Sequence, residues 1–577
     1  MTISKSSRGR RAFLKNVPLT IAAAVAAPKM LGAQAPSAPA AATTPTGITA
    51  ESLGIAQQIV GVNLPLPERE QARSLVQNNL ANVEAIRKVS VPLELEPAFS
   101  FHPFHSIRPA VPSKPTAASP RSTPRAVTLR AKPANLEDVA FESVAQLGAR
   151  LRARQFTSTD LTKMYLSRLK RADAALFCVV TFTEALALEQ AAQADKEIRA
   201  GKWRGPLHGI PYGIKDLFAT KDILTTWGAK PYSTRVPDYD ATAVVRMREA
   251  GAVMIAKLST GELAVGDIWF RATTRNPWNP ERGSSGSSAG PASASSAGLV
   301  GFAVGTETGG SIISPASTCG VVGLRPTYGR SSRFGCMTLR WTLDKVGALA
   351  RTVADTALVL EALHGPDGKD ETVVDLPFVW NGAASVKGKR LGYIEREFTA
   401  ANAASKPLLD AALETYRRAG ATLVPMSMPD LPANALYAIL NAEAGAMFDE
   451  LVRSGGINEM ADKGTNGRAN QLRASRFISA VDYIRAQRVR TLLLQQVNAL
   501  FAGPSAVHAF LAPSSSGSVT ACNLTGHPAI TVPCGFANGL PVGLMVTGPL
   551  YEEARILDVA AAFESATEFH TKHPAVS

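Results

Sequence analysis

Three short apolar runs, each bounded by glycine, constrain the fold of this chain more than any other feature. They read "GIPYGI" (209–214), "GAVMIAKL" (251–258) and "GLVGFAVGT" (298–306), and stretches with helical patterns lie between them. Continuous apolar runs are typical of strands buried on both faces, and their alternation with helices predicts a largely parallel or mixed sheet. At 577 residues and 46% hydrophobic, the chain can bury such a core. We therefore expect an α/β fold.

The helical stretches around these runs outline the main domain, which we place at 138–575. "TSTD" (157–160) is a capping pattern ahead of an amphipathic helix. An Ala-rich helix is expected over 180–200, and a final helix over 552–567. The segment 387–520 has a more helical and variable pattern.

The first 35 residues resemble a twin-arginine export signal. Arg10 and Arg11 precede an apolar run from Val17 to Ala27, and Ala33 and Ala35 offer a small-residue cleavage site. The run is too short to cross roughly 30 Å of hydrocarbon as a helix. Export to a bacterial periplasm, with a twin-arginine signal peptide at 1–35, is therefore expected. An uncleaved membrane anchor or a basic tail is the alternative.

Three further segments separate this signal from the main domain. Residues 36–46 form a Pro/Ala/Thr linker. Residues 47–90 form a short helical unit, in which Val76 and Val83 belong to an apolar stripe at helical spacing. Residues 91–137 form a Pro-rich extended linker.

Charge and cysteine content exclude several classes of protein. Six lysines and arginines and no acids precede Ala35, which leaves about +8 of the formal +14. The basic stretch 121–132 contains no aromatic residue, so nucleic-acid binding has little support. The five cysteines are widely spaced without a C-x-x-C pair, and no metal site is readable. We expect no cofactor, and cysteines that are buried and mostly free.

Two segments carry residues with chemistry that has more than one interpretation. Lys215 lies among apolar residues in "GPLHGIPYGIKDLF" (205–218), where burial would lower its pKa and make it a base. In isolation, a surface lysine is the simpler interpretation. "GSSGSSAGP" (283–291) is either a flexible linker or a hydrolase elbow, because 286–290 matches G-x-S-x-G. An elbow needs an apolar strand directly before it, and "TRNPWNPERGSS" shows no strand pattern.

A third segment, "GTETGGSIISP" (305–315), follows an apolar run. Its adjacent glycines before Ser311 let backbone N–H groups approach a ligand. The segment lacks the lysine of a phosphate-binding loop, whereas a nest for a developing oxyanion fits it.

Taken in order, "HGIPYGIKD", "NPWNPERGSSGSSAG" and "GTETGGSIISPASTCGVVGLRPTYGR" resemble the amidase signature family. The resemblance extends over about 138–575 and is weakest over 370–520. It implies the amidase signature fold, in which helices cover both faces of a large central mixed β-sheet. Here that fold would carry an N-terminal helical extension.

The resemblance also assigns roles. It makes Ser311 the nucleophile and Lys215 the base, and it selects Ser287, 24 residues before the nucleophile, as the serine that relays the proton. In the family this serine follows a cis peptide bond, here Gly286–Ser287. The backbone N–H groups of the 308–311 segment would receive the oxyanion, and they belong to Thr308, Gly309, Gly310 and Ser311 itself.

Ser288 would add a hydrogen bond to Lys215. Four positions depart from the family pattern. Ser285 and Ala289 replace glycines, Glu307 replaces an aspartate, and Ile313 replaces an arginine. The last change suggests that a supporting ion pair is missing.

The function expected from these residues is that of an exported serine hydrolase that cleaves a linear amide through an acyl-Ser311 intermediate. Its partner would be a small-molecule amide, with no nucleic acid, no membrane after export, and a homodimer left open. One alternative is a glutamine-hydrolysing amidotransferase-type subunit, since 47–90 faintly resembles the helper subunit of such enzymes. The other is a non-catalytic binding protein on the same fold.

Overall fold

The structure is a computed structural model that describes residues 47–91, 98–99 and 127–575. The expected signal peptide at 1–35, the linker at 36–46 and much of the Pro-rich linker at 91–137 lie outside the described residues. The chain from Ile48 onward forms one compact unit, so the helical unit at 47–90 belongs to the same body as the main domain.

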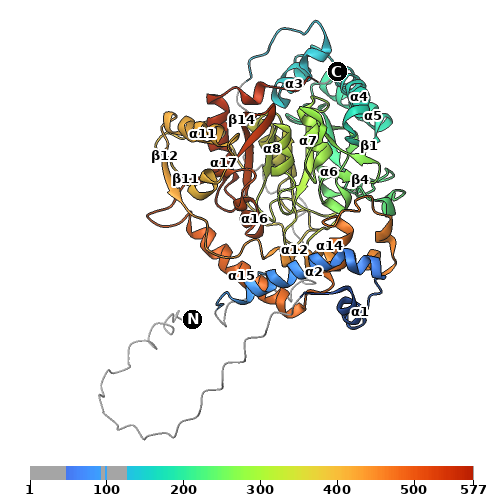
Figure 1. The fold of residues 1–577 in the computed structure, drawn as a ribbon. Coiled ribbons are helices and arrows are strands. Elements are labelled where there is room, and N and C mark those ends of the chain that lie inside the picture. Colours follow the sequence, from blue (N-terminus) through green and yellow to red (C-terminus); the bar gives the residue numbers. More distant parts are fainter. Residues whose placement is uncertain (1–46, 92–97, 100–126, 576–577) are drawn as a thin grey trace, which may run out of the picture. The chain divides into compact units, whose positions relative to one another are not determined.

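An eleven-stranded mixed sheet forms the centre of the fold (Figure 1). Its strands, in spatial order, are β1 (Val179–Phe182), β3 (Val253–Leu258), β2 (Pro211–Lys215), β8 (Phe302–Glu307), β10 (Lys345–Ala350), β9 (Val322–Arg325), β14 (Ala529–Ala537), β15 (Leu540–Thr547), β13 (Ala509–Pro513), β11 (Arg390–Ile394) and β12 (Thr422–Met426). Two small hairpins lie outside it: β4 (Ile268–Trp269) with β5 (Ala272–Thr273), and β6 (Arg275–Asn276) with β7 (Asn279–Gly283).

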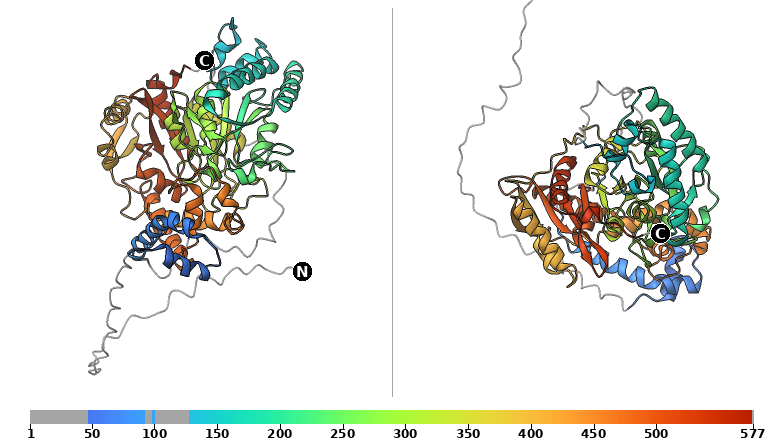
Figure 2. Two further views of the ribbon diagram at one scale, coloured as in Figure 1. Left: turned by 45° about the vertical axis from the view of Figure 1, so that its right-hand side comes forward. Right: turned by 90° about the horizontal axis from the view of Figure 1, so that it is seen from above.

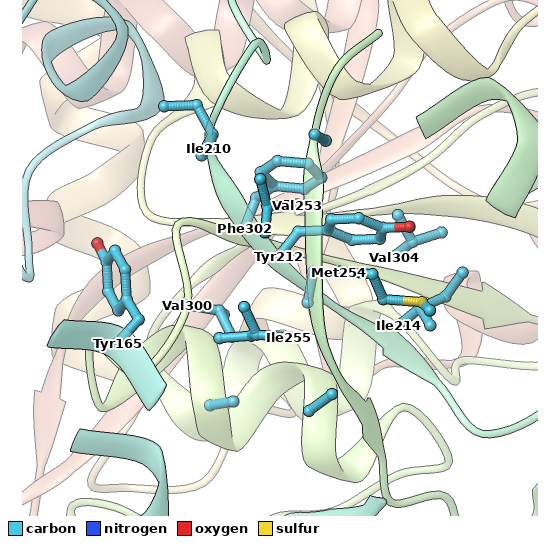
Figure 3. Packing of buried hydrophobic residues seen from close by; sticks show 14 of the residues in the cluster. Tyr165, Ile210, Tyr212, Ile214, Val253, Met254, Ile255, Val300, Phe302 and Val304 are labelled. Atoms are coloured by element: carbon cyan, nitrogen blue, oxygen red, sulfur yellow. The ribbon is translucent and has the colours of Figure 1, made fainter. Parts of the chain in front are cut away.

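The three glycine-bounded runs form β2, β3 and β8. These strands are neighbours, with β2 parallel to both β3 and β8, and every residue in them is buried. The prediction of a buried, mixed sheet is therefore confirmed. Figure 3 shows the core that they form, in which the rings of Tyr212 and Phe302 stack with centroids 5.2 Å apart.

Helices cover both faces of the sheet, as the fold class predicted. The helices are α1 (Ala50–Ile59), α2 (Leu66–Arg87), α3 (Val144–Arg152), α4 (Ser158–Leu176), α5 (Glu184–Arg199), α6 (Thr242–Glu249), α7 (Ala289–Ser296), α8 (Ile313–Cys319), α9 (Val353–Leu363), α10 (Glu395–Thr399), α11 (Lys406–Arg418), α12 (Tyr437–Met447), α13 (Asp449–Arg453), α14 (Arg468–Ser475), α15 (Ala480–Ala499), α16 (Gly517–Leu524) and α17 (Glu553–Ala566). Leu349 of β10 packs with Ala316 of α8, whereas the adjacent Ala348 and Ala350 belong to a cluster with Val359 of α9. Since side chains alternate along a strand, α8 and α9 lie on opposite faces.

Two local predictions met different outcomes. The capping pattern at 157–160 is confirmed, because Thr157 caps α4 in a reciprocal capping box with Asp160. The Ala-rich helix at 180–200 was placed too early. Residues Val179–Phe182 form strand β1, which pairs with β3, and α5 begins only at Glu184.

The segment 387–520 is more helical, as expected, but it also contributes three strands to the main sheet. β11, β12 and β13 form one end of that sheet. The outermost of them, β12, has no fully buried residue, and Pro425 interrupts its apolar residues, which is typical of an edge strand.

The N-terminal helices α1 and α2 pack against α14 and α15, helices from the far end of the sequence (Figure 2). Leu53 and Val76 form a small apolar cluster with Ala474 of α14. Arg87 forms a two-pronged ion pair with Asp482 of α15, with both N···O distances at 3.0 Å. The helical unit therefore braces α14 and α15 from outside.

All five cysteines are free, and four of them are buried, which confirms the expectation for these thiols. Within the part of the chain that the structure describes, no three metal-ligating side chains come together. No helix there combines the length and apolarity needed to cross a membrane.

Candidate active site

Lys215 is the last residue of β2 and is completely buried. Its Nζ lies 2.9 Å from Ser287 Oγ and 2.9 Å from Thr306 Oγ1. Burial lowers its pKa from 10.5 to about 7, and the nearby charges of Asp344 and Glu307 offset this effect only in part. A neutral amine at this position can accept a proton from Ser287.

Ser287 lies in the loop that leads into α7, and only 1% of its surface is exposed. The Gly286–Ser287 peptide bond is cis, as the resemblance implied. Only glycine fits at 286, because a Cβ there would lie 1.9 Å from the carbonyl oxygen of Gly266. Packing of this loop against its neighbour thus places Ser287 beside Lys215.

The short strand β7 precedes this loop and α7 follows it, but β7 is not the apolar strand that an elbow needs, as the sequence predicted. β7 pairs only with β6, outside the main sheet, and its three central residues are exposed. The prolines and charged residues in this stretch leave no apolar pattern by which the strand could be recognised in the sequence. It is not the buried strand that a hydrolase elbow requires.

Ser311 lies on the turn between β8 and α8 and is partly exposed. The amide of Ser288 donates to the carbonyl oxygen of Ser311 at 3.1 Å, which joins the two serine loops. The Ser311 hydroxyl itself makes no hydrogen bond with any described residue. Lys215 is therefore hydrogen-bonded directly to Ser287. The backbone hydrogen bond between Ser288 and Ser311 holds Ser311 near this pair.

The backbone amides of Gly309, Gly310 and Ser311 have no acceptor among the described residues. Gly310 has a φ of +126°, which glycine adopts freely and other residues rarely do. These free donors in the turn provide the nest that an oxyanion needs. Thr308 is held by its side chain, since its hydroxyl donates to Asp344 Oδ1 at 2.6 Å.

The expected hydrogen bond from Ser288 to Lys215 is not present. Ser288 Oγ donates instead to the carbonyl oxygen of Thr306 at 3.0 Å and accepts from the Thr306 amide at 3.3 Å. The amine of Lys215 is instead hydrogen-bonded to Ser287 and Thr306. Ser288 therefore acts on the lysine only indirectly, through its hydrogen bonds to Thr306.

Glu307 holds the turn that carries Ser311 in shape. One carboxylate oxygen accepts from the amides of Ile312 and Ile313, at 2.7 and 2.8 Å. The other accepts from Arg325 at 2.8 Å and from Asn523 at 2.7 Å. Burial alone would raise the pKa of Glu307, but Arg325 and these hydrogen bonds lower it below the usual value. Because Ile313 replaces an arginine, a supporting ion pair was expected to be missing. Arg325 of β9 supplies an ion pair to Glu307 instead.

A cavity of about 400 Å³, within the volume range of small-molecule sites, is connected to this turn through Asp344. Met337, Trp341 and Asp344 contribute to its lining, and Asp344 is the residue that accepts from Thr308. On the other side, Tyr437 and Leu440 of α12 cover Gly309, since a Cβ there would meet them at 3.3 and 3.5 Å.

The sequence alone missed three residues of this site: Thr306, Asp344 and Tyr437. Thr306 stands inside the quoted motif "GTETGGS", and a threonine in an otherwise apolar buried strand was the available signal. Asp344 and Tyr437 had no comparable signal, because nothing in their local sequence indicates that they meet the turn.

The chain matches a known protein family over more than half of its length. The family described as "Amidase" matches residues 160–520 of this chain. Among curated proteins, the chain is 37% identical over 481 residues to a glutamyl-tRNA(Gln) amidotransferase subunit of Methylococcus capsulatus, covering 75% of this chain and 99% of that protein. The same subunit of Thermosynechococcus vestitus is 36% identical over 477 residues, covering 75% and 99%.

Solved structures give a second set of similarities. The native peptide amidase of Stenotrophomonas maltophilia has 30% sequence identity and a TM-score of 0.67, over 76% of this chain and 99% of that one. The corresponding glutamyl-tRNA(Gln) amidotransferase subunit of Thermotoga maritima has 27% identity and a TM-score of 0.63, over 77% and 99%. Both kinds of relative match essentially their whole length.

Proposed function

Because this chain belongs to the amidase signature family, we propose that it hydrolyses the C–N bond of a carboxylic amide through an acyl-Ser311 intermediate. The observation that carries the proposal is the buried amine of Lys215, bonded to Ser287 and adjacent to a turn with free amides. A neutral base, a relay hydroxyl, a nucleophile and an anion nest are the parts that acyl transfer requires.

The proposed proton path uses Ser287 as the intermediate. Neutral Lys215 donates to Thr306 and uses its lone pair to accept the Ser287 proton, while Ser287 accepts the proton of Ser311. Rotation of the unbonded Ser311 hydroxyl toward Ser287 completes the path. The proton then returns by the same route to the departing nitrogen, and water attacks the ester in the second half-reaction.

The negative charge that develops on the amide oxygen would be stabilised by the amides of Gly309, Gly310 and Ser311. Each such donor contributes on the order of 10²–10³ in rate in well-studied hydrolases. Glu307 supports these donors indirectly, because its hydrogen bonds to Ile312 and Ile313 fix the end of the turn.

The curated relatives favour the amidotransferase-type alternative over a free-standing amidase. Those aligned above are named as subunits of glutamyl-tRNA(Gln) amidotransferase, whereas peptide amidase stands among the solved structures. As a second candidate, the same Ser311 chemistry would release ammonia from glutamine for use by partner subunits. Glutamine turnover by the isolated chain is compared with turnover in the presence of an extract of the source cells. The comparison distinguishes a subunit that works with partner subunits from a free-standing amidase.

Export through the twin-arginine pathway is a further part of the proposal, motivated by Arg10, Arg11 and the apolar run after them. An exported enzyme would not meet charged tRNA. Cell fractionation therefore tests both points together: recovery in the periplasm supports the free-standing amidase, and recovery in the cytoplasm supports the amidotransferase-type alternative.

The central test is the intact mass of the protein after treatment with a fluorophosphonate, compared with that of Ser311→Ala. We expect one adduct on the parent and none on the variant, and Ser314→Ala serves as a matched control that keeps the adduct. An adduct that persists in Ser311→Ala would refute the assignment of the nucleophile. Binding of amides without any adduct or turnover would support the non-catalytic alternative.

A further inference from the structure

The small hairpin formed by β4 and β5 lies outside the main sheet (Figure 1). It begins directly after Asp267 and ends directly before Thr274. The amide of Thr274 donates to the carbonyl oxygen of Asp267 at 3.0 Å, which closes the base of the hairpin. Both residues at this base contact the loop that carries Ser287, here called the relay loop (residues 283–287).

The base of the hairpin presents two acceptors to consecutive amides of the relay loop. The carbonyl oxygen of Thr274 accepts from the amide of Ser284 at 2.9 Å. The carboxylate of Asp267 accepts from the next amide, that of Ser285, through Oδ2 at 2.9 Å. These two hydrogen bonds fix the chain just ahead of the relay serine.

The same segment also packs closely against the backbone of the relay loop. A Cβ on Gly283 would lie 2.1 Å from Asp267 Oδ2, and a Cβ on Gly286 would lie 1.9 Å from the carbonyl oxygen of Gly266. Gly266 and Asp267 therefore contact three residues of the relay loop between them. Because these contacts leave no free space, the loop cannot shift toward the hairpin.

Ser285 has a backbone conformation that needs such support. Its φ is +61°, in the left-handed region that favours glycine, and other residues adopt it at a cost. Residues in that region persist where the surrounding structure holds them firmly, and they are frequent at functional sites. The hydrogen bond to Asp267 is such a constraint, because the direction of the Ser285 amide depends on this angle.

Asp267 is held by backbone amides rather than by a counterion. It interacts electrostatically with Arg275 but forms no ion pair within the part of the chain that the structure describes, and burial raises its pKa. A partly buried carboxylate without an ion pair adds little to stability, because its burial costs solvation. Its contribution is therefore the set of contacts that it makes with the relay loop.

Ser287 is held independently from its other side. The amide of Ser288 donates to the carbonyl oxygen of Ser311 at 3.1 Å, and Ser288 Oγ donates to the carbonyl oxygen of Thr306. The Ser287 hydroxyl lies between these contacts and the hairpin, 2.9 Å from Lys215 Nζ. Loss of the hairpin contacts would therefore free one end of the relay loop and leave the nucleophile turn in place.

We propose that Asp267 is a positioning residue, whose carboxylate acts through the amide of Ser285 to hold the relay serine at hydrogen-bonding distance from Lys215. This inference rests on the proposed function and deepens it, since it names a residue on which the proton relay depends. Asp267 touches neither the substrate nor the reacting atoms. Its loss should therefore lower kcat, while KM stays close to that of the parent.

The test compares three substitutions at one position. Asp267→Ala removes the acceptor, and Asp267→Leu removes it while keeping a branched side chain. In both variants kcat should fall by about 10- to 100-fold, since displacement of a catalytic group by about 1 Å costs this order of rate. Asp267→Asn keeps an oxygen that can accept from the Ser285 amide, so it should recover most of the loss.

Asp173→Ala is the matched control. Asp173 is also partly buried, and its Oδ1 accepts from the amides of Cys178 and Val179, at 2.7 and 2.8 Å, where the chain enters β1. The control should lose thermal stability and keep the kcat of the parent per folded molecule. Equal kcat in Asp267→Ala and Asp173→Ala would overturn the proposal, and so would a loss in Asp267→Ala that appears only in KM.

Crystal structures of the variants separate this inference from the proposed function. In Asp267→Ala, Ser287 Oγ should move out of hydrogen-bonding distance of Lys215 Nζ, and in Asp267→Asn it should stay. If it does so in a protein that hydrolyses no amide and takes no fluorophosphonate label, the positioning role stands and the function fails. If Ser311 of the parent is labelled and Ser287 keeps its place in Asp267→Ala, the inference is wrong and the function stands.

Discussion

Arg325 and Glu307 form a fully buried ion pair, with 2.8 Å between Arg325 Nη1 and Glu307 Oε1. The arginine comes from β9, in the sheet, and the glutamate's other oxygen holds the amides that begin α8. The pair therefore connects the rigid sheet to the turn of Ser311, and its loss should be felt in both stability and rate.

Glu307→Gln should destabilise the fold by about 3–5 kcal/mol, because Arg325 is left buried without its counterion. kcat should fall as well, since the turn loses its fixed geometry. Urea unfolding and steady-state kinetics measure the two effects. In the double variant with Arg325→Met, stability should partly return while kcat stays low, and recovery of both would contradict the positioning role.

The rate of amide hydrolysis should depend on the protonation of Lys215. Its pKa is lowered to about 7 by burial, and only the neutral amine can accept a proton. Below pH 7, kcat/KM should therefore fall about tenfold per pH unit, and above pH 7 it should reach a plateau. A profile that is flat from pH 5 to 9 would exclude a neutral lysine base.

The same lysine should make the fold less stable than an apolar residue would at neutral pH. The unfolded chain binds a proton at Lys215 up to its ordinary pKa of 10.5, whereas the folded chain releases it near 7. Between these values stability rises with pH. Lys215→Met should therefore gain about 2 kcal/mol at pH 7 after the loss of its hydrogen bonds, and less at pH 10.

Thermal unfolding of Lys215→Met and of the parent at both pH values gives this comparison. Ser287→Ala removes a hydrogen bond to the amine without removing the titrating group, so it should show no gain at pH 7. A stability difference between Lys215→Met and the parent that is equal at pH 7 and pH 10 would argue against a shifted lysine.

Gly310→Ala should slow catalysis by about 10²–10³, because it disturbs the free amides of the turn. The new Cβ would meet Ser314 Oγ at 2.9 Å, at a φ of +126°. Gly365→Ala is a matched control, since Gly365 also has a positive φ but open space around it. Both variants should lose some stability, and only the first should lose kcat. Equal kcat values in the two variants would show that the turn has no role in catalysis.

The brace formed by α1 and α2 should stabilise α14. Val76→Asp places a charge in the apolar contact with Leu53 and Ala474, so α14 should exchange its amide hydrogens faster and the melting temperature should fall by several degrees. Asn78→Asp adds the same charge on the exposed side of α2 and should have little effect. Similar exchange in both variants would mean that the helices are only loosely docked.

Much of the site could be predicted because its parts are local motifs. Lys215, Ser287 and Ser311 each stand in a segment that leaves more than one interpretation open when taken alone, and the resemblance of the three ordered segments to the amidase signature family selects them. The buried runs themselves predict only a parallel or mixed sheet. Thr306 is harder, because a threonine becomes a partner of Lys215 only once β2 and β8 are adjacent.

Other features could not be read from the sequence. The strand at Val179–Phe182 is too short to outweigh the Ala-rich helical pattern that follows it. In β12, Pro425 interrupts the apolar residues, and no residue is fully buried. Arg340 and Arg468 lie far apart in the chain, and each resembles an ordinary surface arginine. That Nε and Nη2 of Arg468 have no hydrogen-bond partner among the described residues is a property of the packed structure, since it depends on which acceptors the fold places nearby.

The brace that α1 and α2 supply has a consequence for how the enzyme behaves on dilution. These helices are joined to the catalytic domain by a single polypeptide, so their docking is a unimolecular event at a local concentration in the millimolar range. A separate polypeptide that bound the same surface would dissociate as the protein is diluted below its dissociation constant. Here α14 and α15 stay supported at any protein concentration.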